Sequence, residues 1–148
     1  MSNYQQILVA IDLSKESNAV VEKAMEISAE ACEMQLVFVQ EPMDSVYVGV
    51  VPQSAAFSGL GNLELQLRAE VKAKMKQFGE RYGVPESNQH IISGSPAREI
   101  HRFAEESGTD LIVIGTHGQK GLQLLLGSTA NAVLHGSGCD VLAVRIKQ

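Results

Sequence analysis

Short apolar runs alternate along the chain with segments of helical periodicity, and this alternation most constrains the fold. Five runs are typical of strands, at residues 7–11, 36–39, 90–92, 110–114 and 141–146. Their nearly continuous apolar character is that of strands covered on both faces. Strands that alternate with helices form a parallel sheet, so the 148 residues predict one α/β domain, an open doubly wound sheet with helices on both faces.

Helical segments lie between these strands. Apolar residues recur every three or four positions within 20–31, 60–82, 97–104 and 128–134, which predicts helices that each bury one side. Turn residues mark the expected helix ends: Ser14 and Ser95 as N-caps, Pro96 in a first turn, and Gly83 and Gly108 after a last turn. Residues 42–61, which hold prolines and glycines, are expected to form a long, partly mobile loop.

The composition excludes several classes of function. A net charge of −5 and a pI near 5.3 leave no basic surface for non-specific binding to nucleic acid or to an anionic membrane. No apolar run approaches the roughly 18 residues of a membrane span, and the N-terminal segment lacks the basic region of a signal peptide. We therefore expect a cytoplasmic protein. Its two cysteines, Cys32 and Cys139, are expected to stay reduced, although one disulfide is possible on counting alone.

Distinctive residues end two of the strands. Asp12 directly follows the first strand, and Gly115 ends the fourth. Ligands of doubly wound sheets bind beyond the carboxyl ends of the strands, where the strand order reverses. If these two strands are neighbours, both ends open into the same crevice.

The segment 115–129 is rich in glycine. Glycine lets a backbone approach a ligand and point its N–H groups at phosphate oxygens. Gly127, Ser128 and Thr129 then open a helix, whose N-terminus favours an anion. The segment contains neither a Walker motif nor G-x-G-x-x-G. It predicts a triphosphate cradle, with an ordinary tight strand-to-helix turn as the alternative.

Three stretches together resemble the universal stress proteins of the UspA superfamily. They are residues 7–14, residues 94–97, and residues 110–118 running on through Gly127 and Ser128. The resemblance covers essentially the whole chain. It implies a five-stranded parallel sheet of order 3-2-1-4-5, in which the first and fourth strands are neighbours.

The resemblance also implies a nucleotide site of ten residues for ATP, with Mg²⁺, or for another adenine nucleotide. In that site the backbone of Ala10 and Val39 would meet the adenine, and Asp12 would lie near the base or ribose. The remaining residues would hold the ribose and phosphates: Gly115, Thr116, His117, Gly118, Gly127, Ser128 and Thr129. Asp12 has an alternative interpretation as a polar cap on the strand-to-helix turn. No role is assigned to three histidines that are expected on the surface or at helix ends: His90, His101 and His135.

The glycine spacing departs from the family's pattern of Gly, two residues, Gly, nine residues, Gly and Ser or Thr. Gly115 and Gly118 fit this pattern, but only eight residues separate Gly118 from Gly127. One residue spans about 3.3 Å of extended chain, which exceeds the tolerance of a hydrogen bond. The start, residues 12–17, resembles UspA itself, and that branch of the family resembles proteins that bind no nucleotide. Unlike that branch, this chain keeps Gly118, Gly127 and Ser128.

Two functions are consistent with these observations. One is a homodimeric stress-response sensor that binds ATP or a related adenine nucleotide, and the other is a UspA-type dimer that binds no nucleotide and acts through protein partners. An enzyme of another α/β family has little support, because no catalytic triad or carboxylate pair is identifiable and Asp12 is the one acid near the proposed phosphates. We expect no catalytic turnover.

The last strand, residues 141–146, is the C-terminal edge of the sheet in that order. It is long and apolar, and only the charges of Arg145 and Lys147 oppose its pairing with another strand. An uncovered edge of this kind invites pairing with another strand. We therefore expect a two-fold homodimer with this strand at the interface, and the family resemblance implies the same arrangement.

Overall fold

The chain folds around one five-stranded sheet in the computed structural model, which describes residues 4–41, 53–116 and 127–146. The strands are β1 (Gln6–Ala10), β2 (Glu33–Gln40), β3 (Gln89–Ser93), β4 (Leu111–Gly115) and β5 (Asp140–Val144). Every neighbouring pair is parallel, and the order is β3-β2-β1-β4-β5. The predicted fold class and strand order are therefore confirmed, with β1 beside β4 at the centre.

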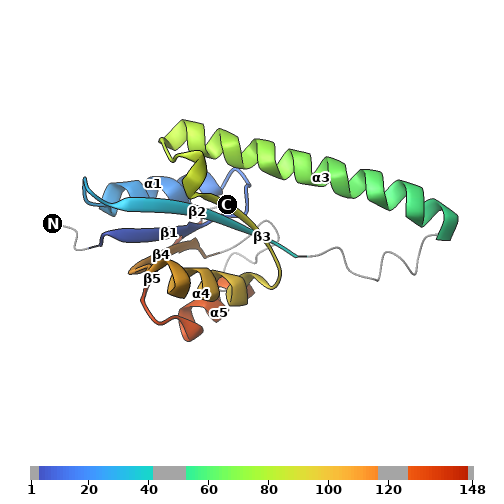
Figure 1. Ribbon diagram of the computed structural model, residues 1–148. Helices are drawn as coiled ribbons and strands as arrows, with labels where there is room; N and C mark the ends of the chain where they lie inside the picture. The colour runs from blue at the N-terminus through green and yellow to red at the C-terminus, as the bar shows by residue number, and fades with distance from the viewer. Residues whose placement is uncertain (1–3, 42–52, 117–126, 147–148) are drawn as a thin grey trace.

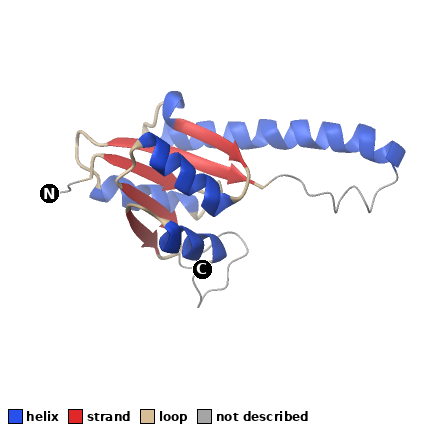
Figure 2. Cartoon of the chain, turned by 60° about the horizontal axis from the view of Figure 1, so that its bottom comes forward, coloured by secondary structure: helices blue, strands red, loops and turns tan. Residues whose placement is uncertain are grey.

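Helices cover both faces of this sheet. The helices α1 (Ser17–Ile27) and α3 (Gln53–Tyr82) lie on one face, and α4 (Pro96–Ser107) and α5 (Ser128–Gly136) lie on the other (Figure 1). A short 3₁₀ turn, η1 (Glu86–Asn88), leads into β3. The helix α3 runs past the carboxyl ends of the strands in both views (Figures 1 and 2).

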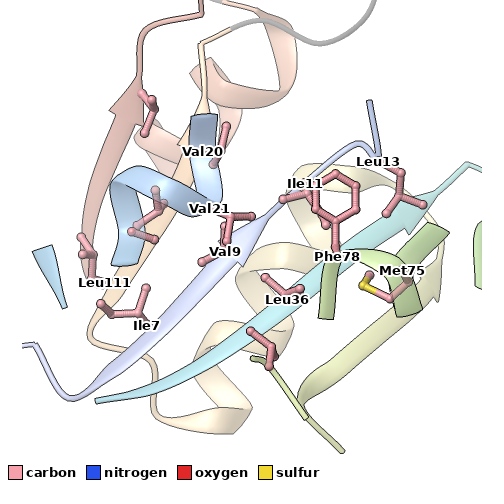
Figure 3. Packing of buried hydrophobic residues seen from close by; sticks show 14 of the residues in the cluster. Ile7, Val9, Ile11, Leu13, Val20, Val21, Leu36, Met75, Phe78 and Leu111 are labelled. Carbon is pink, nitrogen blue, oxygen red and sulfur yellow. The ribbon is translucent and has the colours of Figure 1, made fainter. Parts of the chain in front are cut away.

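Two hydrophobic cores result, one on each face of the sheet. Alternate residues of a strand point to opposite faces, so Ile7, Val9 and Ile11 enter the core under α1 and α3 (Figure 3). Leu8 and Ala10 enter the core under α4 and α5. This double burial is the reason that residues 7–11 and 111–114 are apolar without interruption.

The helix α3 is longer than the periodicity predicted, and its start corrects the expected loop over residues 42–61. The helix already begins at Gln53, and residues 42–52 lie outside the described part. A glycine within a helix costs only about 1 kcal/mol, so Gly59 and Gly61 weaken this helix without ending it. The predicted end is confirmed, because the helix stops at Tyr82 and Gly83 follows with a φ of 71°.

Ser95 and Gly108 flank α4 as predicted, although the Ser95 side chain makes no capping hydrogen bond, and the N-cap of α1 differs from the prediction. Ser95 precedes Pro96 at the start of α4, and Gly108 ends that helix with a φ of 70°. The prediction that Ser14 caps α1 is wrong, because Glu16 occupies the N-cap position. Ser14 instead lies in a preceding turn, where its carbonyl accepts the Ser17 N–H at 3.0 Å.

Of the three histidines that were expected on the surface or at helix ends, two are less exposed than predicted. His90 lies half-buried in β3, where its Nε2 is 2.6 Å from Gln35 Oε1, and burial lowers its pKa. His101 is also half-buried, and its Nε2 is 2.9 Å from the carbonyl oxygen of Val133 in α5. Only His135 fits the prediction, because it lies exposed near the end of α5.

The two cysteines are not bonded to each other. Cys32 packs against the core under α1 and α3, and Cys139 packs against the core on the other face. The sheet therefore separates them, as the expectation of two thiols requires. None of the described helices is long and apolar enough to cross a membrane.

Candidate functional site

The carboxyl ends of β1 and β4 lie side by side and define the candidate site. Ala10 pairs with Ile114 of β4 on one side and with Val37 of β2 on the other. Asp12 and Thr116 each lie two residues beyond that paired position. The crevice predicted from the strand order is thus bordered by Asp12 on one strand end and by Gly115 and Thr116 on the other.

Asp12 holds the turn between β1 and α1 through one carboxylate oxygen. Its Oδ1 accepts the Ser14 N–H at 3.0 Å, the Ser17 hydroxyl at 2.7 Å and the Ser14 hydroxyl. Both serines are buried, so these bonds satisfy polar groups that water cannot reach. No described residue donates a hydrogen bond to Asp12 Oδ2.

Ser17 is a member of this cluster that the sequence did not reveal. Its hydroxyl donates to Asp12 Oδ1 and accepts the Asp12 N–H at 3.1 Å. The residue lies at the first position of α1 and is only 2% exposed. No standard capping pattern relates residues five apart, so only the fold brings the two together.

Leu13 gives this turn an unusual backbone conformation. Its φ of 64° is the one positive φ of a non-glycine residue in the described chain. Such a conformation costs roughly 1–2 kcal/mol. The Leu13 side chain is only 8% exposed and packs with Ile11 and Phe78 (Figure 3). Burying a leucine gains roughly 1.5–3 kcal/mol, so packing offsets the strain and fixes the direction in which the chain leaves Asp12.

Gly115 and Thr116 both have structural tasks at the end of β4. A Cβ at Gly115 would lie 3.2 Å from side-chain atoms of Val20 and Ile146, so the glycine lets α1 and the end of β5 pack closely. The Thr116 N–H donates to the Val144 carbonyl at 2.9 Å, and Thr116 Oγ1 accepts the Ile146 N–H at 3.1 Å. Thr116 thus extends the pairing of β4 and β5 beyond the sheet.

The start of α5 is tied to the same strand end. The Gly127 N–H donates to the Thr116 carbonyl at 2.6 Å, and the Gly127 carbonyl accepts the Asn131 N–H at 2.9 Å. Gly127 has φ −60° and ψ 154°, and no described side chain caps the helix. Ser128 is exposed and Thr129 is half-buried. The first-turn N–H groups of α5, which have no partner within the helix, therefore receive no side-chain cap from the described residues.

The other predicted site residues divide into two groups. Ala10 and Val39 both belong to the core on the α4 and α5 face, so they border the crevice from that side. His117 and Gly118 lie outside the described residues. In the described part, no group of three His, Cys, Asp or Glu side chains is arranged to hold a metal ion.

The site thus offers two features suited to a phosphorylated ligand. One is a carboxylate that the β1–α1 turn orients through its Oδ1 and that can accept a hydroxyl or approach a cation through its Oδ2. The other is the N-terminus of α5, whose partial positive charge attracts anions. Ser14 and Ser17 hold the carboxylate, and the bond from the Gly127 N–H to the Thr116 carbonyl holds the start of α5.

Comparison with known proteins gives consistent matches over the length of the chain. The model of the universal stress protein family matches residues 3–145. Universal stress protein A homolog 2 of Coxiella burnetii is 39% identical over 151 aligned residues, which include 99% of each protein.

Solved structures share the fold. The structure of the hypothetical protein MJ0577 has a TM-score of 0.79 and 27% identity, with 98% of each chain covered. A universal stress protein solved in complex with cAMP has a TM-score of 0.68 and 24% identity, with 97% of this chain and 98% of the other covered.

Proposed function

Because the chain belongs to the universal stress protein family, we propose that it binds an adenine nucleotide at the carboxyl edge of its sheet. The ligand would be ATP with Mg²⁺ or a related adenine nucleotide, and the protein would act in the cytoplasm as a nucleotide-dependent sensor of stress. The observation that carries this proposal is the half-engaged carboxylate of Asp12, whose Oδ1 is fixed by three hydrogen bonds and whose Oδ2 receives none from the described chain.

The residues around Asp12 fit the parts of such a ligand. Asp12 Oδ2 can accept a ribose hydroxyl or lie near the Mg²⁺ that a triphosphate carries. Ser128, Thr129 and the first-turn N–H groups of α5 can hold phosphate oxygens. Bound Mg²⁺ would neutralise part of the phosphate charge, which favours binding to a chain of net charge −5.

A structural neighbour adds support for this ligand class. The universal stress protein solved with cAMP holds an adenine nucleotide, and its fold matches this chain over nearly the whole length. This neighbour supports adenine as the base to test first.

Isothermal titration of nucleotide-stripped protein with Mg·ATP tests the proposal. We expect saturable binding to the native chain and at least tenfold weaker binding to Gly127→Val. Valine accepts the φ of −60° at Gly127, so this substitution should leave the fold intact while its side chain crowds the phosphate position. Ser137→Ala, at the opposite end of α5, is the matched control and should bind like the native chain.

A specific observation favours a second function. The segment between Gly118 and Gly127 is one residue shorter than in the nucleotide-binding pattern of the family. Under this alternative the protein is a dimer that binds no nucleotide and acts through protein partners. Absence of heat from Mg·ATP at millimolar concentration in the titration above would favour it.

We also propose that the bound nucleotide is held rather than hydrolysed. Asp12 is the one acidic residue of the proposed site, and its Oδ1 is already committed to Ser14 and Ser17. One carboxylate without a second acid or base beside it is a poor catalyst of proton transfer. Steady phosphate release from Mg·ATP well above background, lost in Asp12→Ala, would contradict this expectation.

We further propose a homodimer through β5. This strand is one of the two edge strands of the sheet, so its outer backbone groups are available for pairing. Its apolar side chains contribute less than the sequence suggested, because Val144 and Ile146 are buried within the chain itself, at 8% and 7% exposed. The backbone edge and the half-buried Val141 and Leu142 remain as the interface.

A proline substitution tests this dimer. The Val144 carbonyl accepts a hydrogen bond from Thr116, so Val144 directs its backbone toward β4 and Ala143 directs its N–H outward. Ala143→Pro removes one outer donor without removing a β4–β5 bond. We expect sedimentation velocity at micromolar concentration to give a dimer for the native chain and a monomer for Ala143→Pro. A native monomer would refute the proposal.

A further inference from the structure

A small groove lies between the β1–α1 turn and α3. Its volume is about 200 Å³. Leu13 and Phe78 form its apolar base, where they pack together in the core (Figure 3). The walls come from two elements, with Lys15 and Asn18 on the turn and the start of α1, and Lys74 and Arg81 on α3.

The charge of this groove is entirely positive. Lys15, Lys74 and Arg81 line it, and none of its lining residues is acidic. In the described part of the chain none of these three cations forms an ion pair, because the ion pairs of that part involve Lys23 and Arg102. Three unpaired cations around one groove are unexpected in a chain whose net charge is −5. Their mutual repulsion favours an anion between them.

Arg81 is held in place for such an anion. Its Nη1 donates to Asn18 Oδ1 at 2.8 Å, and Asn18 is fixed in turn because its Nδ2 donates to the Lys15 carbonyl at 2.9 Å. The Tyr82 hydroxyl donates to the same Asn18 oxygen at 2.7 Å. An ordered guanidinium loses less entropy when it binds, and its planar set of donors matches the oxygens of a phosphate.

We propose that this groove is a second anion site, which binds a small phosphate-bearing molecule independently of the nucleotide crevice. The combined charge of the three cations suits the charge of roughly −1.5 to −2 that a phosphate monoester carries at neutral pH. Phosphate would contact Arg81 on α3 and Lys15 on the turn at the same time. The bound anion would therefore join α3 to the turn that also positions Asp12.

The groove and the crevice use different charged groups. The groove uses Lys15 and the cations of α3, whereas the proposed nucleotide site uses Asp12 and the start of α5. Ser14 lies between the two sites, because it lines the groove and also donates to Asp12. The first-turn N–H groups of α1 take no part in the groove site, because Ser17, Asn18 and Ala19 donate theirs to the carbonyls of residues 14–16. The anion would thus be held by side chains.

Backbone amide NMR of the full chain tests this inference, with inorganic phosphate as the probe and chloride at equal ionic strength as the reference. We expect signals of residues 13–18 and 74–81 to shift and to saturate with phosphate alone. Shifts that grow linearly without saturation, or that chloride reproduces, would overturn the inference.

Three variants identify the groups involved. Lys74→Gln and Arg81→Gln should each weaken phosphate binding about tenfold, since a hydrogen bond to a charged group is worth about that factor. Lys76→Gln is the matched control, because Lys76 is an exposed lysine of the same helix that does not line the groove. Equal weakening in Lys74→Gln and Lys76→Gln would overturn the assignment to this groove.

The phosphate titration is repeated on Gly127→Val, which separates the two sites. The inference predicts unchanged saturation at residues 13–18 and 74–81 in that variant, whether or not the native chain binds Mg·ATP. Loss of these shifts in Gly127→Val would mean that phosphate binds only in the nucleotide crevice, and would contradict the second site.

Discussion

Asp12 and Asp110 are two carboxylates at opposite ends of neighbouring strands, and the chain uses them differently. Asp110 precedes β4, where its Oδ2 accepts the Gln5 N–H at 2.9 Å and its Oδ1 accepts the Gln6 N–H at 3.1 Å. Asp12 follows β1, where Oδ1 takes all three of the donors contributed by Ser14 and Ser17. One carboxylate is engaged at both oxygens, and the other at one.

The difference follows from the direction of the strands. At the amino end, β1 enters the sheet beside Asp110 and supplies two backbone N–H groups that have no partner in the ladder. At the carboxyl end the chain turns away after Asp12 and can satisfy only the oxygen that faces the turn. Parallel sheets bind ligands at this end because polar groups remain available there. The comparison suggests that Asp110 serves stability and that Asp12 serves both stability and binding.

The backbone strain at Leu13 measures the free-energy cost of the turn that holds Asp12. Leu13→Ala removes a buried side chain and keeps the positive φ, so we expect it to lower the free energy of unfolding by about 2–3 kcal/mol. Leu13→Gly removes the same side chain but also relieves the strain. It should therefore be about 1 kcal/mol more stable than Leu13→Ala. Urea unfolding of the two variants measures this difference.

The order of these two variants is the informative result. Glycine at an ordinary backbone position is less stable than alanine, as Ala97→Gly in the first turn of α4 should demonstrate. An alanine variant of Leu13 that is more stable than the glycine variant would show that the turn is not strained.

Asp110→Ala tests the two hydrogen bonds that Asp110 accepts from the backbone of Gln5 and Gln6 at the amino end of β1. Two hydrogen bonds to a charged, half-buried group are lost and two backbone N–H groups turn to water, so we expect a loss of about 2 kcal/mol. Glu106→Ala, on the exposed surface of α4, should change stability by no more than about 0.5 kcal/mol. The unfolding midpoint in urea gives both values, and equal effects would remove the structural role assigned to Asp110.

Asp12→Asn should affect stability less than either change. The amide oxygen can replace Oδ1 toward Ser14 and Ser17, with its nitrogen directed to the crevice, so we expect a loss below about 1 kcal/mol. Asp12→Ala removes the acceptor altogether and should cost more. Thermal unfolding of the two variants checks this order, and an equally large loss in both would mean that the carboxylate charge itself holds the turn.

The smallest expected effect is on the pH dependence of stability, and it comes from His90, which lies on the α4 side of β3. Burial lowers its pKa from the ordinary value of 6.5, so the unfolded chain binds a proton at higher pH than the folded chain does. Stability from this group is present above that value and decreases as the pH falls through it to the folded pKa. His90→Gln should therefore lose less stability between pH 7.5 and 5.5 than the native chain.

The control for this pH dependence is His135→Gln. His135 is exposed near the end of α5, and its replacement should leave the loss between the two pH values unchanged. Urea midpoints measured at both pH values decide the comparison. If His90→Gln lost as much stability between pH 7.5 and 5.5 as the native chain, His90 would not contribute to the pH dependence.

The sequence predicted the sheet well because its physical signal is local. Runs such as Leu111–Ile114 are apolar at every position, and only a strand covered on both faces requires that. The signal for the start of α4 at Ser95 and Pro96 was equally local. A proline in the first turn of a helix removes no intrahelical hydrogen bond, because the N–H groups there have no partner within the helix.

The predictions failed where a contact or a helix that the sequence pattern does not indicate decides the structure. Ser14 looks like an N-cap, but Asp12 recruits its hydroxyl and the helix begins three residues later. His90 becomes half-buried only when Gln35 and the ring of Phe103 pack beside it. Residues 53–61 were predicted to be a loop because of their glycines and the neighbouring proline, yet they belong to α3.

The candidate site was predicted in position but only partly in its contacts. The neighbouring ends of β1 and β4 are confirmed by the strand register. Gly115 and Thr116 have packing and pairing roles that no local pattern indicates, because Val20, Val144 and Ile146 reach them through the fold. The family pattern of glycines likewise did not reveal Ser17.

The most direct test of the account is a thermal melt of the nucleotide-stripped protein with and without Mg·ATP, made on the matched variants Asp12→Asn and Asp110→Asn. Ligand at about 100 times its dissociation constant adds about 2.7 kcal/mol, a shift of roughly 5–11 °C for a domain of this size. We predict this shift for the native chain and for Asp110→Asn, and its loss in Asp12→Asn. A native chain with no shift at millimolar Mg·ATP, or an equal shift in Asp12→Asn, would contradict the account.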